Sequence, residues 1–375
     1  MEKETKEITP PSTPPTHTDE EKNNKDIEEN LIFQKSLTEN LNSRFYNNNN
    51  NENKNDKNNN IDYKNYKSLK DFSYYYNDQM QLRSIDGEEK FKFVNQEHYD
   101  RLGDVIVTTI QDMMKSEPYN LNEIWIPEKS ENETENENFA QSNIFLSKDF
   151  YDNSENLMVL INGSGAVKSG QWARSLCIND SLNSGTILPY LKEAKDNGFS
   201  IIVLNPNFNY IEESSSSSNE KSNDNDEPLK KKKKVERQYV KGSESSQNHV
   251  LYVFDHFISK SPAKKIIIVA HSFGGVNTCH LLDNRAEKIE NRLAGIALTD
   301  SVHSISSKSN QFTKSFFGNQ DKTINFIRSE EEVGTDLGFS KPQGCRIASA
   351  GHTIHEFTSA FCKVPLFNFI LKIIK

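Results

Sequence analysis

The stretch KIIIVAHSFGGVNTCHLL, residues 265–282, joins an apolar β-branched run, a serine among small residues and a helix-prone segment. The run 266–269 predicts a strand buried on both faces and 276–282 predicts a helix, so Ser272 stands at a sharp strand-to-helix turn. Such a nucleophile elbow strains the serine backbone and projects its hydroxyl away from the sheet. The stretch therefore predicts an α/β fold with a candidate serine nucleophile.

The elbow departs from the usual Gly-x-Ser-x-Gly pattern at one position. Ala270 stands where the first glycine is expected, and its single methyl group is small enough for such a turn. The pair Gly274-Gly275 predicts that the helix packs closely on the strand. A serine in an ordinary strand-to-helix turn is the alternative interpretation of the same residues.

A serine hydroxyl needs a positioned base, and usually a carboxylate that orients this base. Asp300 follows the apolar run 294–299, so we expect it at the carboxyl end of a strand, on the same sheet edge as the serine. A third apolar run, 345–349, leads into a loop that contains His352 and His355. We expect His355 to be the base and Asp300 the orienting acid. The alternatives are His352 as the base and a turn-capping role for the aspartate.

An oxyanion hole requires backbone N–H groups that point at the charge developing on the substrate oxygen. Phe273, directly after the serine, is expected to supply one of them. The apolar run 157–161 ends in a glycine-rich turn, where Ser164 and Gly165 are the expected second donors.

Two more histidines and one tryptophan lie close to these motifs in the sequence. His271 and His303 flank the candidate nucleophile and acid, and either could line a pocket or order a turn. The segment Gln171-Trp172-Ala173-Arg174 could also line a pocket, or form an exposed interface anchor, since Trp and Arg dominate interface hot spots. A helix start that packs Trp172 into the core is the third interpretation.

The order of strand, oxyanion loop, helix, strand, insert, helix and elbow predicts the fold class. We expect an α/β-hydrolase-like domain with a mostly parallel, doubly wound sheet that is covered by helices, and a site at the carboxyl edge of its strands. The sequence further predicts a strand pair at 90–94 and 123–127, a helix at 99–114, and a terminal helix at 357–374 that is broken near Pro365.

Two segments are too polar to bury a core. Residues 1–65 are rich in Asn, Glu and Lys, and we expect a disordered tail followed by one domain at 66–375. A second such segment at 212–246 is expected to be a disordered insert within this domain. It carries a nuclear import candidate, for which a solvated charged loop is the alternative: Lys230, Lys231, Lys232, Lys233 and Lys234.

Composition favours a soluble intracellular protein. The formal net charge is −9, which argues against general binding to nucleic acid phosphates. There is no apolar stretch of membrane-spanning length and no secretory signal, so no membrane association is expected. The four cysteines are scattered and are expected to be reduced core residues, and we predict no metal site and no cofactor.

Four segments together resemble the argonaute-binding cotranscriptional regulator family. They are NGSGAVKSGQWAR at 162–174, VLNPNFNY at 203–210, AHSFGG at 270–275 and LTDSVH at 298–303. The resemblance covers about residues 70–372 without the insert. It implies an α/β-hydrolase fold, a domain that is also found fused to some histone deacetylases, and it places the family's nucleophile at Ser272.

The same resemblance implies a function that is described through partners. It suggests a nuclear factor, with cytoplasmic presence left open, that binds argonaute or chromatin-associated proteins. Small-RNA-guided heterochromatin silencing or splicing control is then the expected role, with small RNA associated directly or through these partners. The alternative is a serine esterase or amidase that acts on a small acyl substrate through Ser272, His355 and Asp300.

Overall fold

The structure is a computed structural model that describes residues 62–128, 139–213 and 236–375. Most of the expected tail at 1–65, most of the expected insert at 212–246, and the five lysines at 230–234 lie outside these residues. The chain divides into a unit at Met1–Ile61 and a unit at Asp62–Lys375, and the fold below is that of the second.

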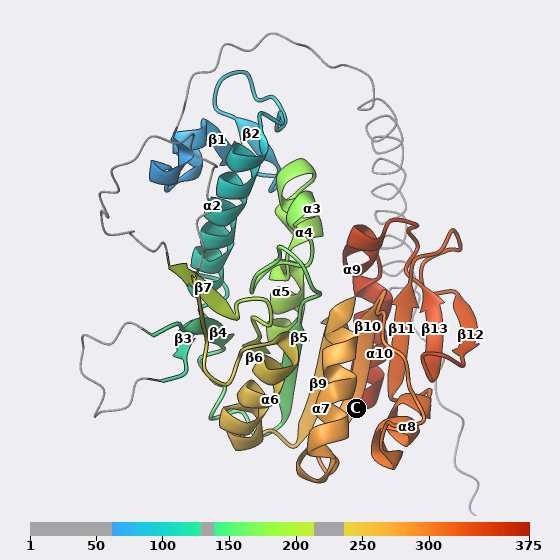
Figure 1. Ribbon diagram of the computed structural model, residues 1–375. Coiled ribbons are helices and arrows are strands. Elements are labelled where there is room, and N and C mark those ends of the chain that lie inside the picture. The colour runs from blue at the N-terminus through green and yellow to red at the C-terminus, as the bar shows by residue number, and fades with distance from the viewer. Residues whose placement is uncertain (1–61, 129–138, 214–235) are drawn as a thin grey trace, which may run out of the picture. The chain divides into compact units, whose positions relative to one another are not determined.

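One large sheet organises this unit (Figure 1). Its strands within the described residues are β3 (Asn122–Ile126), β4 (Ser142–Leu146), β5 (Asn156–Ile161), β6 (Phe199–Val203), β9 (Lys265–His271), β10 (Leu293–Thr299), β11 (Thr323–Ile327), β12 (Asp336–Ser340) and β13 (Cys345–Ser349). Their order across the sheet is β12-β13-β11-β10-β9-β5-β6-β4-β3. The six from β13 to β6 are parallel, whereas β12, β4 and β3 each pair antiparallel with their inner neighbour.

Helices cover both faces of the sheet. One face carries α2 (Gln96–Lys115), α5 (Leu188–Asp196) and α10 (Lys363–Ile374), and the other carries α6 (Ser246–His256), α7 (Phe273–Ile289) and α8 (Gln311–Gly318) (Figure 1). Successive β9 residues alternate between the two apolar cores, with Ile267 on the first side and Ile268 on the second. Burial on both faces explains why the central strands read as continuous apolar runs. The predicted mostly parallel, doubly wound sheet covered by helices is confirmed.

Smaller elements complete the described chain. They are two hairpins and a set of short helices: β1 (Tyr74–Tyr76) with β2 (Leu82–Ser84), β7 (Tyr210–Glu213) with β8 (Glu236–Tyr239), η1 (Tyr63–Asn65), η2 (Leu69–Phe72), α3 (Arg174–Asn179), α4 (Leu182–Gly185), η3 (Ile258–Lys260), η4 (His355–Phe357) and α9 (Thr358–Phe361).

The chain changes direction across the sheet between β5 and β9. It runs outward from β5 to β6, returns to form β9 on the other side of β5, and then continues through β10 and β11 toward β13. The loops that follow β5 and β9 therefore leave the sheet in opposite directions. The point where two such loops diverge is the usual place for a site in an open α/β sheet.

The expected strand at 90–94 is wrong. The strand β3 pairs with β4, and residues 90–94 form no strand. The ring of Phe91 packs against the rings of His98 and Tyr99 on α2, while Phe93 is 63% exposed. The side chain of Asn95 accepts a hydrogen bond from the N–H of His98 and caps α2, which ends the extended segment.

The terminal helix breaks at Cys362, not near Pro365. Pro365 lies in the first turn of α10, where the N–H that proline lacks has no partner within the helix. No single helix among the described residues is long and apolar enough to cross a membrane, although the bent pair His355–Phe361 and Lys363–Ile374 reaches that length and apolarity together.

The cysteines lie in the core with free thiols: Cys177, Cys279, Cys345 and Cys362. Burial raises the pKa of Cys177 and of Cys345 to about 12. These thiols are therefore protonated at neutral pH, which makes them poor nucleophiles.

Gly274→Ala is expected to destabilise the fold. A methyl group at this position would lie 2.7 Å from the carbonyl oxygen of Ile161 and 3.1 Å from that of Asn162, where α7 approaches the end of β5. Because backbone atoms cannot turn aside, we expect the free energy of unfolding to fall by about 1–3 kcal/mol in urea titrations.

Gly318→Ala is the matched control, because a methyl group there would meet nothing within 4 Å. We expect it to leave stability unchanged or slightly higher, since alanine favours helix. Equal losses in both variants would contradict the close packing of α7 on β5.

Candidate active site

Ser272 occupies the sharp turn between β9 and α7 that the sequence predicts. Its backbone has φ 53° and ψ −119°, a conformation that residues with a side chain rarely adopt. Its N–H donates to the carbonyl of Thr299 over 3.0 Å, and its carbonyl accepts from the N–H groups of Gly275 and Val302. These bonds hold the strained turn, and the half-buried serine lies at the carboxyl edge of the sheet.

Small residues allow the elbow to lie against the loop that follows β5. A methyl group on Gly163 would lie 2.9 Å from Cβ of Ser272, so glycine is needed at this point of contact. The Cβ of Ala270 is 3.3 Å from the position that a methyl group on Gly274 would take. The replacement of the usual first glycine by Ala270 is thus accommodated by the glycine across the turn.

Asp300 and His355 form a close polar pair at this edge. Asp300 follows β10, and its carboxylate lies 2.6 Å from Nδ1 of His355. A carboxylate can only accept, so Nδ1 carries the proton and Nε2 keeps a free lone pair. The Asp300 side chain is 11% exposed, whereas the His355 side chain is 30% exposed. The imidazole can therefore exchange a proton at Nε2 while the aspartate fixes its orientation.

Arg328 contacts Asp300 through both its backbone and its side chain. Its backbone N–H donates to Asp300 Oδ1 over 3.2 Å, and its guanidinium Nε lies 3.6 Å from Asp300 Oδ2. Burial acts to raise the pKa of Asp300, but the hydrogen bonds from His355 and from the Arg328 backbone N–H, together with the charge of the Arg328 guanidinium, lower it below its usual value. The aspartate is consequently ionised at neutral pH.

Ser272 and His355 form no hydrogen bond with each other in this structure. No residue that the structure describes forms a hydrogen bond with the Ser272 hydroxyl. Such hydrogen bonds are often long or misaligned without substrate and tighten when it binds. The His355 ring lies over His271, the neighbour of the serine, with 4.7 Å between ring centroids.

The loop after β5 presents unpaired backbone donors. Ser164 and Gly165 are exposed, and Gly165 has φ 107°, which favours glycine. Within the described part of the chain, no group accepts a hydrogen bond from the backbone N–H of Ser164, Gly165 or Phe273. The contact of Gly163 with Ser272 brings this loop next to the elbow.

Hydrogen bonds with Asn207, in the segment after β6, hold this loop. The side-chain amide of Asn207 donates to the carbonyls of Gly163 and Val167 over 2.7 and 3.0 Å. Lys168 Nζ in turn donates to the carbonyl of Asn207 over 2.7 Å. These hydrogen bonds fix the loop and leave the N–H groups of Ser164 and Gly165 without an acceptor among the described residues.

The other histidines of the motifs have structural partners. His352 lies between the rings of Phe357 and Phe361, and its Nδ1 accepts from the N–H of Ile354, so it is not the partner of the aspartate. His303 accepts from the Ser301 hydroxyl and donates to the carbonyl of Gln343, which orders the turn after β10.

Trp172 is part of the core. It is 2% exposed and packs edge-on against the rings of Tyr190 and His271. Arg174 is also largely buried, and it donates to the carbonyls of Tyr99 and Asp100. The interpretation of this segment as an exposed interface anchor is wrong, because both hot-spot side chains are used within the fold.

Arg328 and Asn207 are the residues of the site that sequence reasoning missed. Arg328 follows β11, whose sequence Thr-Ile-Asn-Phe-Ile is a short apolar run that would have indicated a strand ending at this edge. Asn207 lies within one of the four family-like segments, but nothing in that pattern indicates which carbonyls its amide reaches.

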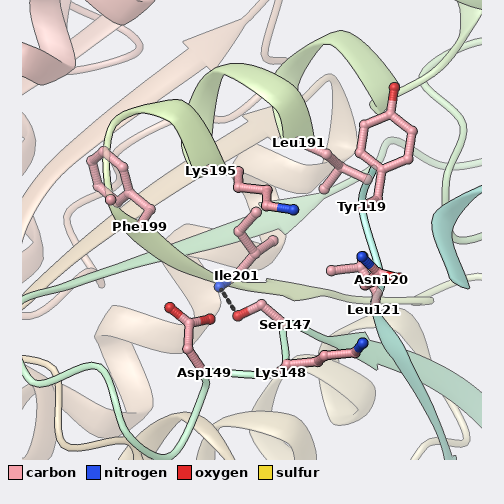
Figure 2. A pocket seen from close by; sticks show the side chains of 11 residues that line it. Tyr119, Asn120, Leu121, Ser147, Lys148, Asp149, Leu191, Lys195, Phe199 and Ile201 are labelled. Atoms are coloured by element: carbon pink, nitrogen blue, oxygen red, sulfur yellow. Dashed lines mark hydrogen bonds between the residues drawn. The ribbon is translucent and has the colours of Figure 1, made fainter. Parts of the chain in front are cut away.

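A separate cavity of about 290 Å³ opens at the opposite edge of the sheet (Figure 2). Its lining includes the buried Leu121, Leu191 and Phe199 and the exposed Lys148 and Lys195. It lies at the amino end of β6, whereas the candidate nucleophile follows the carboxyl end of β9, so it is not part of this site. Among the described residues, no three His, Cys, Asp or Glu side chains gather as metal ligands.

One family model, several curated relatives and several solved structures resemble this chain. The Arb2 domain family matches residues 66–333. The Cotranscriptional regulator ARB2A homolog of Dictyostelium discoideum is 64% identical over 360 residues, 92% of this chain and 91% of that protein. Cotranscriptional regulator ARB2A of Homo sapiens is 37% identical over 339 residues, 80% of this chain and 79% of that protein. A solved histone deacetylase from Saccharomyces cerevisiae aligns with a TM-score of 0.45 and 13% identity, over 74% of this chain and 100% of that chain.

Buried histidines should make the fold sensitive to acid. Burial lowers the pKa of His249 and His271 to about 3 and that of His303 to about 4, from 6.5. Each is neutral when folded and takes up a proton on unfolding between these values and pH 6.5. The free energy of unfolding should therefore fall as pH is lowered below about 6.5, by up to about 1.4 kcal/mol per pH unit for each histidine.

His249→Gln tests this assignment in urea titrations at pH 4–7. The glutamine carbonyl can replace Nε2 as the acceptor for the N–H of Asn205, but it does not titrate. We expect the slope of the unfolding free energy against pH to correspond to the uptake of about one proton fewer on unfolding. The exposed His256 of the same helix provides the control, His256→Gln. An unchanged slope in His249→Gln would contradict the neutral buried state.

Proposed function

This chain belongs to the Arb2 domain family, as the four sequence segments predicted, and on that premise we propose that it is a nuclear cotranscriptional regulator that carries a serine hydrolase site. It acts through chromatin-associated or argonaute partners in small-RNA-guided silencing or splicing control. The names of the Dictyostelium and human relatives support the regulatory part of this proposal. The geometry around Ser272 supports the chemical part.

One observation carries the chemical proposal. A strained serine at φ 53° lies at the same sheet edge as an imidazole whose Nδ1 is held 2.6 Å from a buried carboxylate. A stability requirement alone does not favour positive φ at a serine, because such a backbone costs of order 1–3 kcal/mol. The conformation is explained if the hydroxyl has to stand clear of the strand and face a substrate.

The proposed reaction is acyl transfer from an ester or amide. Ser272 Oγ attacks the carbonyl carbon as its proton passes to Nε2 of His355, and Asp300 stabilises the imidazolium that forms. The carbonyl oxygen gains negative charge and accepts hydrogen bonds from the N–H of Phe273 and from Ser164 or Gly165.

The tetrahedral intermediate then collapses. The bond to the leaving group breaks, and His355 returns its proton to the departing alcohol or amine. A water molecule then attacks the acyl carbon and gives a proton to His355. The bond between this carbon and Ser272 Oγ breaks, His355 returns the proton to Oγ, and the acid leaves. The bonds and protons of this reaction balance without an oxidant, a reductant or a cofactor.

A binding module without chemistry is the second candidate. The open Ser272–His355 link favours it, because a docking role does not require that hydrogen bond. The two functions predict different behaviour toward an active-site probe, so one experiment separates them.

Fluorophosphonate labelling of the purified protein tests the chemical proposal. We expect the wild-type protein to be labelled on Ser272, and Ser272→Ala to lose the label completely. His355→Ala should lower the labelling rate by at least about 100-fold, because the serine loses its base. Ser315→Ala, at an exposed position on α8, is the control and should be labelled like wild type. No labelling of the folded wild-type protein would contradict the hydrolase site.

Cellular localisation tests the regulatory proposal. A fluorescently tagged chain should concentrate in the nucleus, and replacing Lys230 to Lys234 by glutamine should lower its nuclear-to-cytoplasmic ratio several-fold. The matched control replaces Lys192 and Lys195, two exposed lysines of α5, and should leave the ratio unchanged. Exclusion of the wild-type chain from the nucleus would contradict this role.

A further inference from the structure

His271 adjoins the candidate nucleophile in the chain and contacts the candidate base through its ring. It precedes Ser272 in the chain and is 3% exposed. Its ring lies against the His355 ring, with 4.7 Å between centroids and 32° between planes. The ring of Trp172 packs on it edge-on, with centroids 6.2 Å apart. His355 thus has an aromatic surface on one side, in addition to its hydrogen bond with Asp300.

Polar contacts fix the His271 ring. Its Nδ1 lies 2.9 Å from the carbonyl oxygen of Thr299, which can only accept, so Nδ1 carries the proton. The hydroxyls of Thr299 and Ser359 lie 3.0 and 3.2 Å from the same nitrogen and 2.7 Å from each other. The ring is therefore tied to the residue before Asp300 and to α9, the helix that follows His355.

The same carbonyl also accepts the N–H of Ser272. One oxygen thus receives donors from the elbow backbone and from the His271 ring, and its own residue precedes the candidate acid. His271 consequently contacts the elements that carry all three members of the proposed triad. Its burial among these groups also lowers its pKa to about 3, so the ring stays neutral beside the imidazolium that forms during acyl transfer.

We propose that His271 is a positioning residue that holds the His355 imidazole at the angle needed to reach both Asp300 and Ser272. The face of the His271 ring supplies most of this positioning by packing against the His355 ring. The hydrogen bond from Nδ1 to the Thr299 carbonyl makes a smaller contribution by anchoring the His271 ring. This inference rests on the proposed hydrolase function, but the position of His355 can be measured without activity.

Two substitutions separate the two contributions. His271→Asn keeps an N–H group near the position of Nδ1 but removes the ring. His271→Phe keeps the ring and removes the N–H, and the Thr299 carbonyl still has the Ser272 N–H as a donor. His98→Asn is the matched control, because His98 is also buried among aromatic rings but lies on α2, away from the site.

Two readouts are measured on each folded variant. The first is the rate constant for fluorophosphonate labelling of Ser272. The second is the proton NMR signal of the His355 Nδ1–H that Asp300 accepts, assigned by its loss in Asp300→Asn. We expect His271→Asn to slow labelling about tenfold or more and to broaden or abolish the signal, because a misplaced base loses reactivity steeply. His271→Phe should keep most of the labelling rate and most of the NMR signal, because it retains the ring. His98→Asn should change neither the rate nor the signal.

Wild-type labelling and signal in His271→Asn would overturn the positioning role. If the wild-type protein is not labelled at all, the hydrolase proposal fails, and the NMR signal alone still decides whether His271 positions His355. Should His271→Asn not fold, His271→Phe decides, since loss of the signal in a folded protein that retains the ring would also overturn the inference.

Discussion

The contact between Gly163 and Ser272 is the constraint on which the site depends. It occurs where the sheet changes direction, between the loops after β5 and β9. A methyl group at Gly163 would lie only 2.9 Å from the serine Cβ, so the loop approaches the elbow as closely as a backbone can. This approach brings the loop that carries Ser164 and Gly165 next to the elbow that carries Phe273, the two segments expected to form an oxyanion hole. The strained serine backbone is compatible with that role and has no other evident use.

A second constraint joins the elbow to the acid and the base. The Thr299 carbonyl accepts both the Ser272 N–H and the His271 ring, and Asp300 follows directly. Asp300 is held in turn by the Arg328 N–H and by His355. The three candidate catalytic groups come from segments far apart in the sequence, yet a few hydrogen bonds at one sheet edge set their relative positions.

Local sequence patterns were sufficient to predict the central strands and the candidate residues at their ends. The runs 266–269 and 294–299 read as buried strands, and their carboxyl ends placed Ser272 and Asp300 on one edge. Residues 90–94 alternate like a strand but have no partner in the sheet, because alternation does not specify pairing. The roles of Arg328 and of Asn207 depend on which backbone groups the folded chain brings near them, and neither spacing nor composition carries that information.

A crystal structure of the protein after reaction with a fluorophosphonate tests the central claim most directly. The account predicts a phosphonyl group on Ser272 Oγ, with its oxygen within hydrogen-bond distance of the N–H of Phe273 and of Ser164 or Gly165. It also predicts His355 Nε2 turned toward the bond formed at Oγ. An adduct on another residue, or an oxygen that points away from both N–H groups, would contradict the assignment of this edge as a hydrolase site.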